Sequence, residues 1–284
     1  MKRGREIAAF QGEKGAFSQE AARRFLGDGI ETLPCQRFED VFSALDRRKA
    51  TAAVIPIENT LAGSVHENYD HLLHFDFDIV AETSVRIMHN LIAPPGVSFR
   101  RIRRVYSHPV ALSQCLDFFA KNRQLEKVPF YDTAGSVKML MEARPKDAGA
   151  IASALAAEMY GARILKRSLE DDHRNFTRFF LLRRADSPHR LPATSSGDRG
   201  WKTSIVFTTR NVPGALFRAI SVFALRDLNL TKIESRPLRG KPWEYLFYLD
   251  FVGRLDEPKC QNALRHLREL ADFIRVLGCY PRGE

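Results

Sequence analysis

The feature that most constrains the fold is a run rich in proline, serine, glycine and threonine from Ala185 to Gly200, which reads ADSPHRLPATSSGDRG. Such a run contains several turn formers and little that can pack into a core. At 284 residues, the chain also exceeds the usual size of a single core. We therefore expect two domains, residues 1–185 and 201–284, joined by a linker at residues 186–200.

Upstream of this linker, short β-rich runs alternate with helical patterns, which predicts an α/β fold with a mostly parallel sheet covered by helices. The expected strand and helix pairs are Ile7–Phe10 with Ser18–Leu26, Ala52–Ile57 with Ser64–Leu73, Val105–Ser107 with Pro109–Asn122, and Gly149–Ile151 with a helix from Ser153 that ends at Gly161.

Two extended segments, Ile79–Ala93 and Ser168–Arg184, would carry the chain from one set of these units to another and back. Two such crossings imply two lobes around a hinged cleft. We expect the hinges near residues 80–86 and 165–175.

Downstream of the linker the order of elements changes to strand, helix, strand, strand, helix, strand. The expected segments are Thr203–Thr208, Pro213–Arg226, Asn229–Arg236, Glu244–Phe251, Glu257–Ala271 and Phe273–Cys279, with a turn at Gly240, Lys241 and Pro242. This order predicts a βαββαβ (ferredoxin-like) sandwich with helices on one face of an antiparallel sheet.

The formal net charge of +10 at pH 7 could indicate nucleic-acid binding. However, the basic residues are scattered and are not interleaved with aromatic residues at a regular spacing. The clusters Lys2–Arg5 and Arg100–Arg104 are interpreted as solvated surface. We expect no nucleic-acid partner, and a small acidic metabolite would suit the positive field as well as RNA would.

The apolar runs are too short for a membrane span, and the N-terminus lacks an apolar signal core. We therefore expect a cytoplasmic protein with no membrane partner. The cysteines Cys35, Cys115, Cys260 and Cys279 lie far apart and show no ligand-like spacing to histidine, so we expect reduced packing residues and no metal.

Polar loops follow several expected strands, and ligands of open α/β sheets bind beyond the carboxyl ends of strands. The loop Gly12–Ser18 combines glycines with Ser18, which can cap the next helix and leave amides facing an anion. It lacks the GxGxxG spacing of a dinucleotide site. Glu58 and Asn59 follow the next strand, and the alternative is that they only satisfy loop backbone groups.

Ser107 and Gln114 are about two helical turns apart, so both could face one pocket, although Ser107 could simply cap the following helix. His108 has no visible partner, and we interpret it as a solvent-facing or structural imidazole. The loop Asp132–Ser136 is suited to bringing a carboxylate close to backbone amides, and Asp132 or Thr133 could equally be a helix cap.

Thr177 and Arg178 lie next to each other before the apolar strand Phe180–Leu182. A hydroxyl can donate to a leaving oxygen while a guanidinium pairs with a carboxylate. A Thr-Arg pair on a strand is common, so the spacing alone assigns no function.

In combination and in this order, these loops resemble prephenate dehydratase. The matching blocks are Gly12–Ser18, PIEN at Pro56–Asn59, GSV at Gly63–Val65, SHP at Ser107–Pro109 with Gln114-Cys115, DTAGS at Asp132–Ser136, IAS at Ile151–Ser153 and NFTRF at Asn175–Phe179. After the linker, two further blocks resemble the phenylalanine-binding motifs of the family's ACT domain: Pro213, Gly214, Ala215 and Leu216, then Glu234, Ser235, Arg236 and Pro237.

The resemblance implies a carbon-oxygen lyase that converts prephenate into phenylpyruvate, water and carbon dioxide in phenylalanine biosynthesis, without metal or organic cofactor. It implies that Thr177 is catalytic and that the substrate cleft is lined by Ser18, Glu58, Asn59, Ser107, Gln114, Thr133 and Arg178. It further implies a two-lobed catalytic domain like that of periplasmic binding proteins, feedback regulation by L-phenylalanine at the ACT domain, and a homodimer or homotetramer.

Three positions depart from the family pattern. Thr60 stands where serine is usual, Val110 where glutamine is common, and Ser136 where a small apolar residue is frequent. The preference for prephenate over its amino analogue arogenate therefore stays open, and arogenate dehydratase is one alternative. A non-catalytic, amino-acid-responsive binding protein is the other.

Overall fold

The computed structural model describes residues 6–187, 200–238, 240–241 and 243–283. The chain forms two compact units, Met1–His71 with Thr83–Leu181 and Leu72–Glu82 with Leu182–Glu284. Most of the expected linker (188–199), the basic cluster Lys2–Arg5 and Pro242 of the expected turn lie outside the described residues. None of the described helices is long and apolar enough to cross a membrane.

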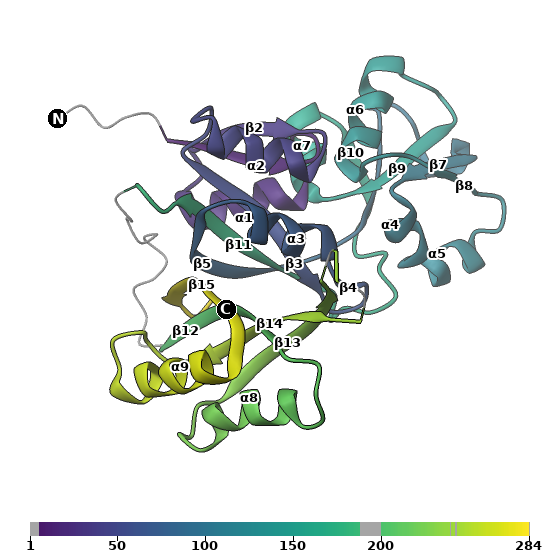
Figure 1. Ribbon diagram of the computed structural model, residues 1–284. Helices are drawn as coiled ribbons and strands as arrows, with labels where there is room; N and C mark the ends of the chain where they lie inside the picture. The colour runs from purple at the N-terminus through teal and green to yellow at the C-terminus, as the bar shows by residue number, and fades with distance from the viewer. Residues whose placement is uncertain (1–5, 188–199, 239, 242, 284) are drawn as a thin grey trace. The chain divides into compact units, whose positions relative to one another are not determined.

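The first lobe is built on a sheet with the strand order β2-β1-β3-β11-β5, in which β4 pairs with β3 (Figure 1). Strand β1 runs parallel to β2 and β3, and its residues Ala8, Ala9 and Phe10 are fully buried, as in a strand covered on both faces. The strands are β1 Ile7–Gln11, β2 Glu31–Cys35, β3 Ala52–Asn59, β4 Gly63–Ser64, β5 Phe77–Arg86 and β11 Phe176–Arg184; the helices are α1 Phe17–Leu26, α2 Phe38–Asp46 and α3 His66–His74.

The second lobe has a mixed sheet with the order β10-β6-β9-β7-β8. Strand β7 is parallel to β8 and β9, whereas β6 is antiparallel to β9 and β10, so the expectation of mostly parallel pairing holds only for part of this sheet. The strands are β6 Asn90–Ala93, β7 Arg104–Ser107, β8 Glu126–Pro129, β9 Ala148–Ala152 and β10 Arg163–Lys166; the helices are α4 Pro109–Ser113, α5 Leu116–Lys121, α6 Thr133–Ala143 and α7 Ala154–Tyr160, with a 3-10 turn at Phe99–Arg101.

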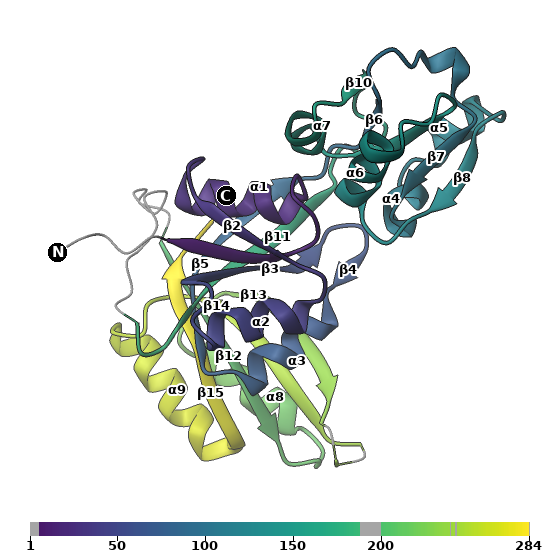
Figure 2. The ribbon, with the colours of Figure 1, turned by 90° about the horizontal axis from the view of Figure 1, so that it is seen from above.

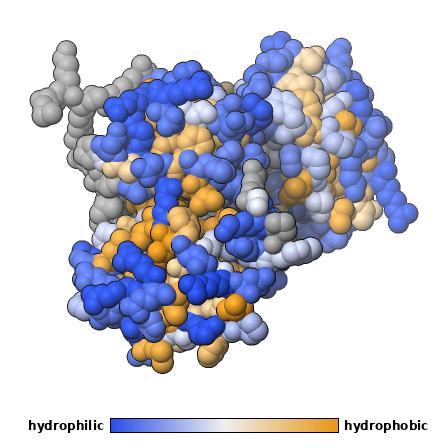
Figure 3. Space-filling model, viewed as in Figure 1, coloured by the Kyte–Doolittle hydropathy of each residue, from blue (hydrophilic) through white to orange (hydrophobic). Residues whose placement is uncertain are grey.

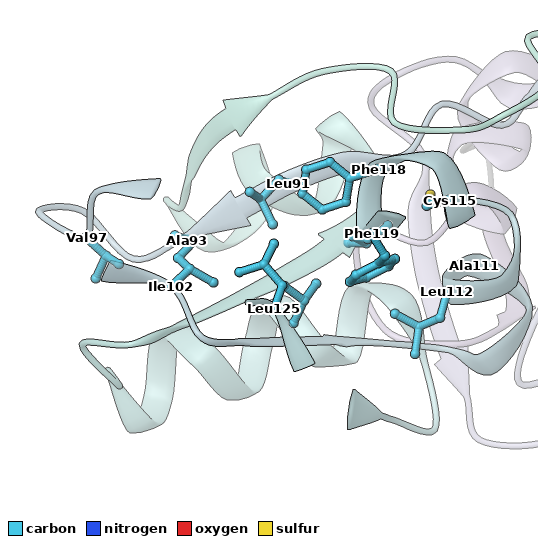
Figure 4. Close-up of a cluster of buried hydrophobic side chains, with 12 residues drawn as sticks. Leu91, Ala93, Val97, Ile102, Ala111, Leu112, Cys115, Phe118, Phe119 and Leu125 are labelled. Atoms are coloured by element: carbon cyan, nitrogen blue, oxygen red, sulfur yellow. The ribbon is translucent and has the colours of Figure 1, made fainter. Parts of the chain in front are cut away.

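A dense apolar core supports the second lobe (Figure 4). Side chains from β6, such as Leu91, meet those of the short helices α4 and α5, including Leu112 and Phe119. The helix α7 ends at Gly161 in the left-handed conformation, as the sequence predicts. Packed in this way, the helices start at fixed positions beside the carboxyl ends of β7 and β9.

The chain passes between the lobes twice, after Arg86 of β5 and again before Phe176 of β11 (Figure 2). The connections are short, at residues 87–89 and 167–175. Both lobes nevertheless belong largely to the same compact unit, residues 1–71 and 83–181. Loops from both lobes therefore contribute to one site.

The four-stranded sheet of the second unit is antiparallel throughout and has the order β13-β14-β12-β15. The elements are β12 Trp201–Thr209, α8 Ala215–Ala224, β13 Leu230–Pro237, β14 Tyr245–Val252, α9 Pro258–Leu270 and β15 Ala271–Pro281, which is the predicted βαββαβ order. Buried residues of both helices, such as Phe223 and Leu264, pack with Phe207 and Phe251 of the sheet. Figure 3 shows further apolar side chains at the surface over this sheet.

Candidate active site

A cavity of about 320 Å³ lies between the lobes, where loops follow the ends of strands from both sheets. It is concave and largely apolar, with a few polar side chains, as small-molecule sites usually are. The lining residues are Gln11, Ala16, Phe17, Ser18, Pro56, Asn59, Ala62, Val65, Ile87, His89, His108, Val110, Ala111, Gln114, Tyr131, Asp132, Thr133 and Thr177.

The structure brings together five of the residues expected to form the site: Ser18, Asn59, Gln114, Thr133 and Thr177. They come from positions far apart in the chain, on both lobes. This convergence follows from the topology, because the carboxyl ends of β1, β3 and β7 carry three of the loops.

Glu58 and Arg178 do not line this cavity, contrary to our expectation. Successive side chains of a strand point to opposite faces, so Glu58 and Arg178 face away from their neighbours Asn59 and Thr177. Instead, an Arg178 nitrogen lies 3.8 Å from a Glu58 carboxylate oxygen, and the guanidinium lies over the ring of Phe180. A direct contact between Arg178 and a substrate in this cavity is therefore not supported.

Ser107 is also absent from the cavity wall. Its side chain is fully buried, and its hydroxyl donates a hydrogen bond to the carbonyl oxygen of Ile151 at 2.6 Å. It thereby ties β7 to the neighbouring β9. Its position indicates that it supports the wall rather than contacting a ligand.

Asn59 connects the two chain segments that carry the central polar groups. Its Oδ1 accepts hydrogen bonds from the backbone N–H groups of Leu61 and Ala62, at 3.0 and 2.8 Å. Because a backbone N–H can only donate, these bonds fix the orientation of the amide. Its Nδ2 therefore donates to Thr177 Oγ1 at 2.9 Å and to Asn175 Oδ1 at 2.8 Å.

The network continues from Asn175 into the second lobe. Asn175 Nδ2 donates to Gln114 Oε1 at 2.9 Å, and His89 Nε2 lies 3.0 Å from the same oxygen. His89 is buried, and its backbone N–H donates to the buried Glu170 at 2.9 Å. Burial is the main cause that lowers the pKa of His89, partly offset by the hydrogen bond to Gln114 and by Glu170.

Helix N-termini supply the remaining polar groups of the cavity. Helices α1 and α6 begin at Phe17 and Thr133, and the first amides of a helix have no intrahelical acceptor. Among the lining residues that the structure describes, none is lysine or arginine. Recognition of an anion here would therefore rest on amides, hydroxyls and helix ends.

Asp132 stands at the start of α6, where its carboxylate accepts a hydrogen bond from the Gly135 N–H at 2.7 Å. Burial is the main cause that raises the pKa of this carboxyl, opposed by hydrogen bonds from the Gly135 and Glu13 N–H groups. The described residues contain no group of three or more His, Cys, Asp or Glu side chains that could hold a metal ion.

Several polar residues that line the cavity are not among the site residues predicted from the sequence: Gln11, His89, His108, Tyr131 and Asp132. His89 and Asn175 complete the hydrogen-bond network, and His108, interpreted as structural or solvent-facing, lines the cavity. His108 Nδ1 accepts a bond from the Val110 N–H at 3.3 Å, which places its hydrogen on Nε2. Asn175 lies within the NFTRF block, so its position could have been noticed, whereas His89 carries no motif signal.

The two blocks expected to bind phenylalanine lie in the second unit. Gly214 adopts a left-handed conformation, with φ 76°, directly before helix α8. Glu234, Ser235, Arg236 and Pro237 form the end of β13, where Glu234 lies 3.5 Å from Lys232.

Comparison with known proteins identifies two families along the chain. The model of the prephenate dehydratase family matches residues 8–187, and that of the ACT domain matches residues 203–269. A relative from Arabidopsis thaliana, "Arogenate dehydratase/prephenate dehydratase 2, chloroplastic", is 44% identical over 96% of this chain and 72% of that protein.

Two solved structures are similar over almost the whole chain. One, a prephenate dehydratase from Arthrobacter aurescens in complex with L-Phe, has a TM-score of 0.86 and 30% identity over 97% of this chain and 90% of that chain. The other, GqqA, described as a novel type of quorum quenching acylase, has a TM-score of 0.88 and 36% identity over 98% of each chain.

The expected cytoplasmic location is contradicted by the relatives, because the Arabidopsis protein is named as chloroplastic and thus points to the plastid. The physical reason is that plastid transit peptides are amphipathic and rich in Arg and Ser. Because a transit peptide has no apolar core, the lack of such a core could not support a cytoplasmic location.

The family matches agree with the fold in both parts of the chain: a two-lobed α/β domain with a cavity between its lobes, then a βαββαβ sandwich. The chain belongs to the prephenate dehydratase family and carries an ACT domain.

Proposed function

We propose that this protein catalyses the decarboxylating dehydration of prephenate to phenylpyruvate, acting as a carbon-oxygen lyase without a cofactor. In this reaction the ring carboxylate leaves as carbon dioxide, and the electrons of the broken C–C bond enter the ring. The C–O bond on the opposite ring carbon breaks, and the departing hydroxide takes up one proton to become water. Because the ring becomes aromatic, the enzyme has only to lower one barrier.

The observation that carries the proposal is the direction of the hydrogen bond between Asn59 and Thr177. Thr177 Oγ1 accepts from Asn59 Nδ2, so its own hydrogen remains available to the cavity. A hydroxyl that accepts one hydrogen bond becomes a better donor in the next. Thr177 would donate to the departing oxygen and stabilise the charge that develops there.

The substrate carboxylates would be held by amides rather than by a cation. The N-termini of α1 and α6, at Ser18 and Thr133, offer backbone N–H groups, and Gln114 offers its Nε2. The absence of a cation among the described lining residues also suits decarboxylation, because a tightly paired carboxylate is stabilised before it leaves.

Replacing the Thr177 hydroxyl tests the proposal. Thr177→Val keeps the volume and removes the donor, so kcat for prephenate should fall about 10²- to 10³-fold with little change in KM. Thr177→Ser keeps the donor and should retain substantial activity. Phenylpyruvate absorbance measures turnover; a Val variant with near-wild-type kcat would exclude the proposed role, and a wild type without turnover would favour a binding protein.

Arogenate is the second candidate substrate, since relatives at 44% and 43% identity are named for arogenate dehydratase activity. Of the three departures from the family pattern, Val110 alone lies in the described cavity wall. Prephenate and arogenate should be compared with the wild type and with Val110→Gln. A change in the ratio of kcat/KM values between the substrates would assign Val110 to specificity.

Acyl transfer, the chemistry implied by the description of GqqA as an acylase, requires an activated nucleophile next to a base. Among the described residues, neither Thr177 nor Ser107 has a histidine as a hydrogen-bond partner. This geometry favours elimination over acyl transfer for the present chain.

For regulation, we propose that L-phenylalanine binds the ACT domain at Pro213–Leu216 and Glu234–Pro237 and lowers activity. Left-handed Gly214 at the start of α8 leaves backbone amides able to meet a carboxylate. Calorimetry should detect L-phenylalanine binding that is weakened by Gly214→Val, whose side chain disfavours this conformation. Unchanged binding in the variant would exclude this site.

The domain limits proposed are 1–185 and 201–284, and we propose assembly as a homodimer or homotetramer. Exposed apolar side chains of the ACT domain, such as Phe217, at 71% exposure, support association. Light scattering of the full chain would give the number of subunits.

A further inference from the structure

We propose that His89 is a positioning residue, which fixes the side-chain amide of Gln114 so that its Nε2 group donates to the substrate. This inference deepens the proposed dehydratase function and rests on it. It concerns a residue that lines the cavity but belongs to none of the sequence blocks that identify the family.

The N–H groups of Leu61 and Ala62 fix the orientation of the Asn59 side-chain amide. Asn59 Nδ2 donates to one end of the Asn175 amide, so this end has to be the oxygen, Oδ1. The other end of the Asn175 amide is then the nitrogen, Nδ2. Asn175 Nδ2 then donates to the oxygen of Gln114. Each amide in the series therefore has one permitted orientation.

His89 completes the series at Gln114. Because Gln114 Oε1 is an acceptor, the bond of 3.0 Å requires a hydrogen on His89 Nε2. The other ring nitrogen, Nδ1, is buried and has no hydrogen-bond partner among the described residues. A hydrogen on Nδ1 would be buried without an acceptor, so the Nε2–H form of the neutral ring is favoured.

The surroundings hold the imidazole in this place. The backbone N–H of His89 donates to Glu170, and the ring forms a T-shaped contact with the ring of Phe17, at a centroid distance of 5.9 Å and an interplanar angle of 78°. Burial also lowers the pKa of His89, which favours the neutral ring despite the opposing effect of nearby Glu170.

These contacts fix the orientation of the Gln114 side-chain amide. Its oxygen accepts from Asn175 and His89 together, so a rotated amide would set its NH₂ group against two donors. The Gln114 Nε2 has no protein acceptor among the described residues, and Gln114 lines the cavity. Its donors are thus held ready for a carboxylate or hydroxyl oxygen of the substrate, without reorganisation on binding.

Three substitutions of His89 separate positioning from packing. His89→Gln can place an amide donor near the position of Nε2, so kcat/KM should stay within about threefold of the wild type. His89→Asn is too short to reach Gln114, and His89→Leu has no donor; both should lose about 5- to 30-fold in kcat/KM. Asn and Gln are matched in polarity, so equal activity of these two variants would overturn the proposal.

A double-mutant cycle shows whether His89 acts through Gln114. If it does, His89→Asn added to Gln114→Leu should lower kcat/KM by less than about twofold further. A further loss equal to that of His89→Asn alone would contradict the positioning role. Melting temperatures of all variants identify any that lose activity by unfolding.

A measurement that does not depend on activity keeps this inference separate from the proposed function. NMR of the full-length protein with ¹⁵N-labelled histidine at neutral pH detects the protonation of each imidazole nitrogen. The ring whose signals disappear in His89→Gln should have a protonated Nε2 and an unprotonated Nδ1. A protonated Nδ1 would overturn the positioning role even in an active enzyme. The expected pattern in a protein without dehydratase turnover would instead reject the substrate assignment and still agree with donation from His89 Nε2 to Gln114.

Discussion

The side chain of Asn59 determines which polar groups of the cavity donate and which accept. Two backbone N–H groups bind its oxygen, so its nitrogen has to face Thr177 and Asn175. At the scale of single residues, the chemistry of the site thus depends on the direction of hydrogen bonds, which a side chain of the same shape can reverse.

Asn59→Asp tests this dependence. The aspartate can keep the bonds from Leu61 and Ala62, but its second oxygen would accept a hydrogen bond from Thr177 and withdraw that hydrogen from the cavity. We expect kcat to fall about 10²- to 10³-fold, and the melting temperature to fall as well, because the carboxylate would also face the Asn175 and Phe176 oxygens that now accept from Nδ2. Steady-state kinetics and thermal unfolding measure both effects, and a kcat within threefold of the wild type would contradict the assigned direction.

Asp132 provides a test by pH. Burial raises its pKa in the folded protein, so the folded state holds the proton more firmly than the unfolded state. The stability that this group contributes is present below its unfolded pKa and is lost as the pH rises through the folded value. Asp132→Asn keeps a good N-cap without the buried charge.

We therefore expect Asp132→Asn to be more stable than the wild type at neutral pH, with a difference that shrinks as the pH falls toward about 4. Urea unfolding at several pH values measures the difference. A difference that grows on acidification would show that the folded pKa is lowered instead.

Some of the residues predicted from the sequence to form the site line the cavity, and others do not. The neighbours Thr177 and Arg178 were both assigned to the cleft, although the alternation of a strand allows only one of them to face it. His89 could not be found from the sequence, because its signal is the contact with Gln114, which only folding creates.

At the scale of elements, the difference between the expected helix Pro109–Asn122 and the observed pair α4 and α5 shows what local patterns lack. The Asp171 carboxylate accepts hydrogen bonds from the N–H groups of Leu116 and Asp117, at 2.7 and 3.0 Å. Asp171 thus caps the start of α5, although it lies 55 residues after Leu116 in the chain. The break that places Gln114 at the end of α4 therefore has a long-range cause.

The glycine loop after β1 gives a prediction at this scale. Gly15 and Gly27 both have φ of 91°, so alanine at either position is strained. A Cβ at Gly15 would also lie 2.5 Å from the Cα of Ala156 at the start of α7, whereas one at Gly27 would meet nothing within 4 Å. Gly27→Ala is thus a matched control for the close approach of the loop after β1 to helix α7.

We expect Gly27→Ala to lower the free energy of unfolding by about 1–2 kcal/mol and to leave kcat/KM near the wild-type value. Gly15→Ala should cost more stability, and it should also lower kcat/KM by displacing the loop that carries Ser18. Urea unfolding and steady-state kinetics check both variants. Equal effects would show that the contact between Gly15 and Ala156 contributes nothing.

At the scale of the whole molecule, the compact units do not follow the expected division at the linker. The first half of β5, with residues 72–82, groups with the ACT domain, although the prephenate dehydratase match covers it. Composition predicts a linker, but it could not reveal this grouping, which depends on contacts such as Lys202 with Glu82, 120 residues apart. The order of the ACT elements was predictable, because each has a clear local pattern.

Lys202 and Glu82 form an ion pair between β12 and β5. A Lys202 Nζ to Glu82 oxygen distance of 2.7 Å and side-chain exposures of 10% and 6% make it a buried pair. Lys202→Met leaves the Glu82 carboxylate buried without this partner, so we expect about 3–5 kcal/mol less stability. The double variant Glu82→Leu with Lys202→Met removes both charges and should recover most of this loss, because the desolvation penalty also disappears. Urea unfolding of the full chain measures each variant; a double variant no more stable than Lys202→Met would mean that other contacts of these side chains hold β5 to β12.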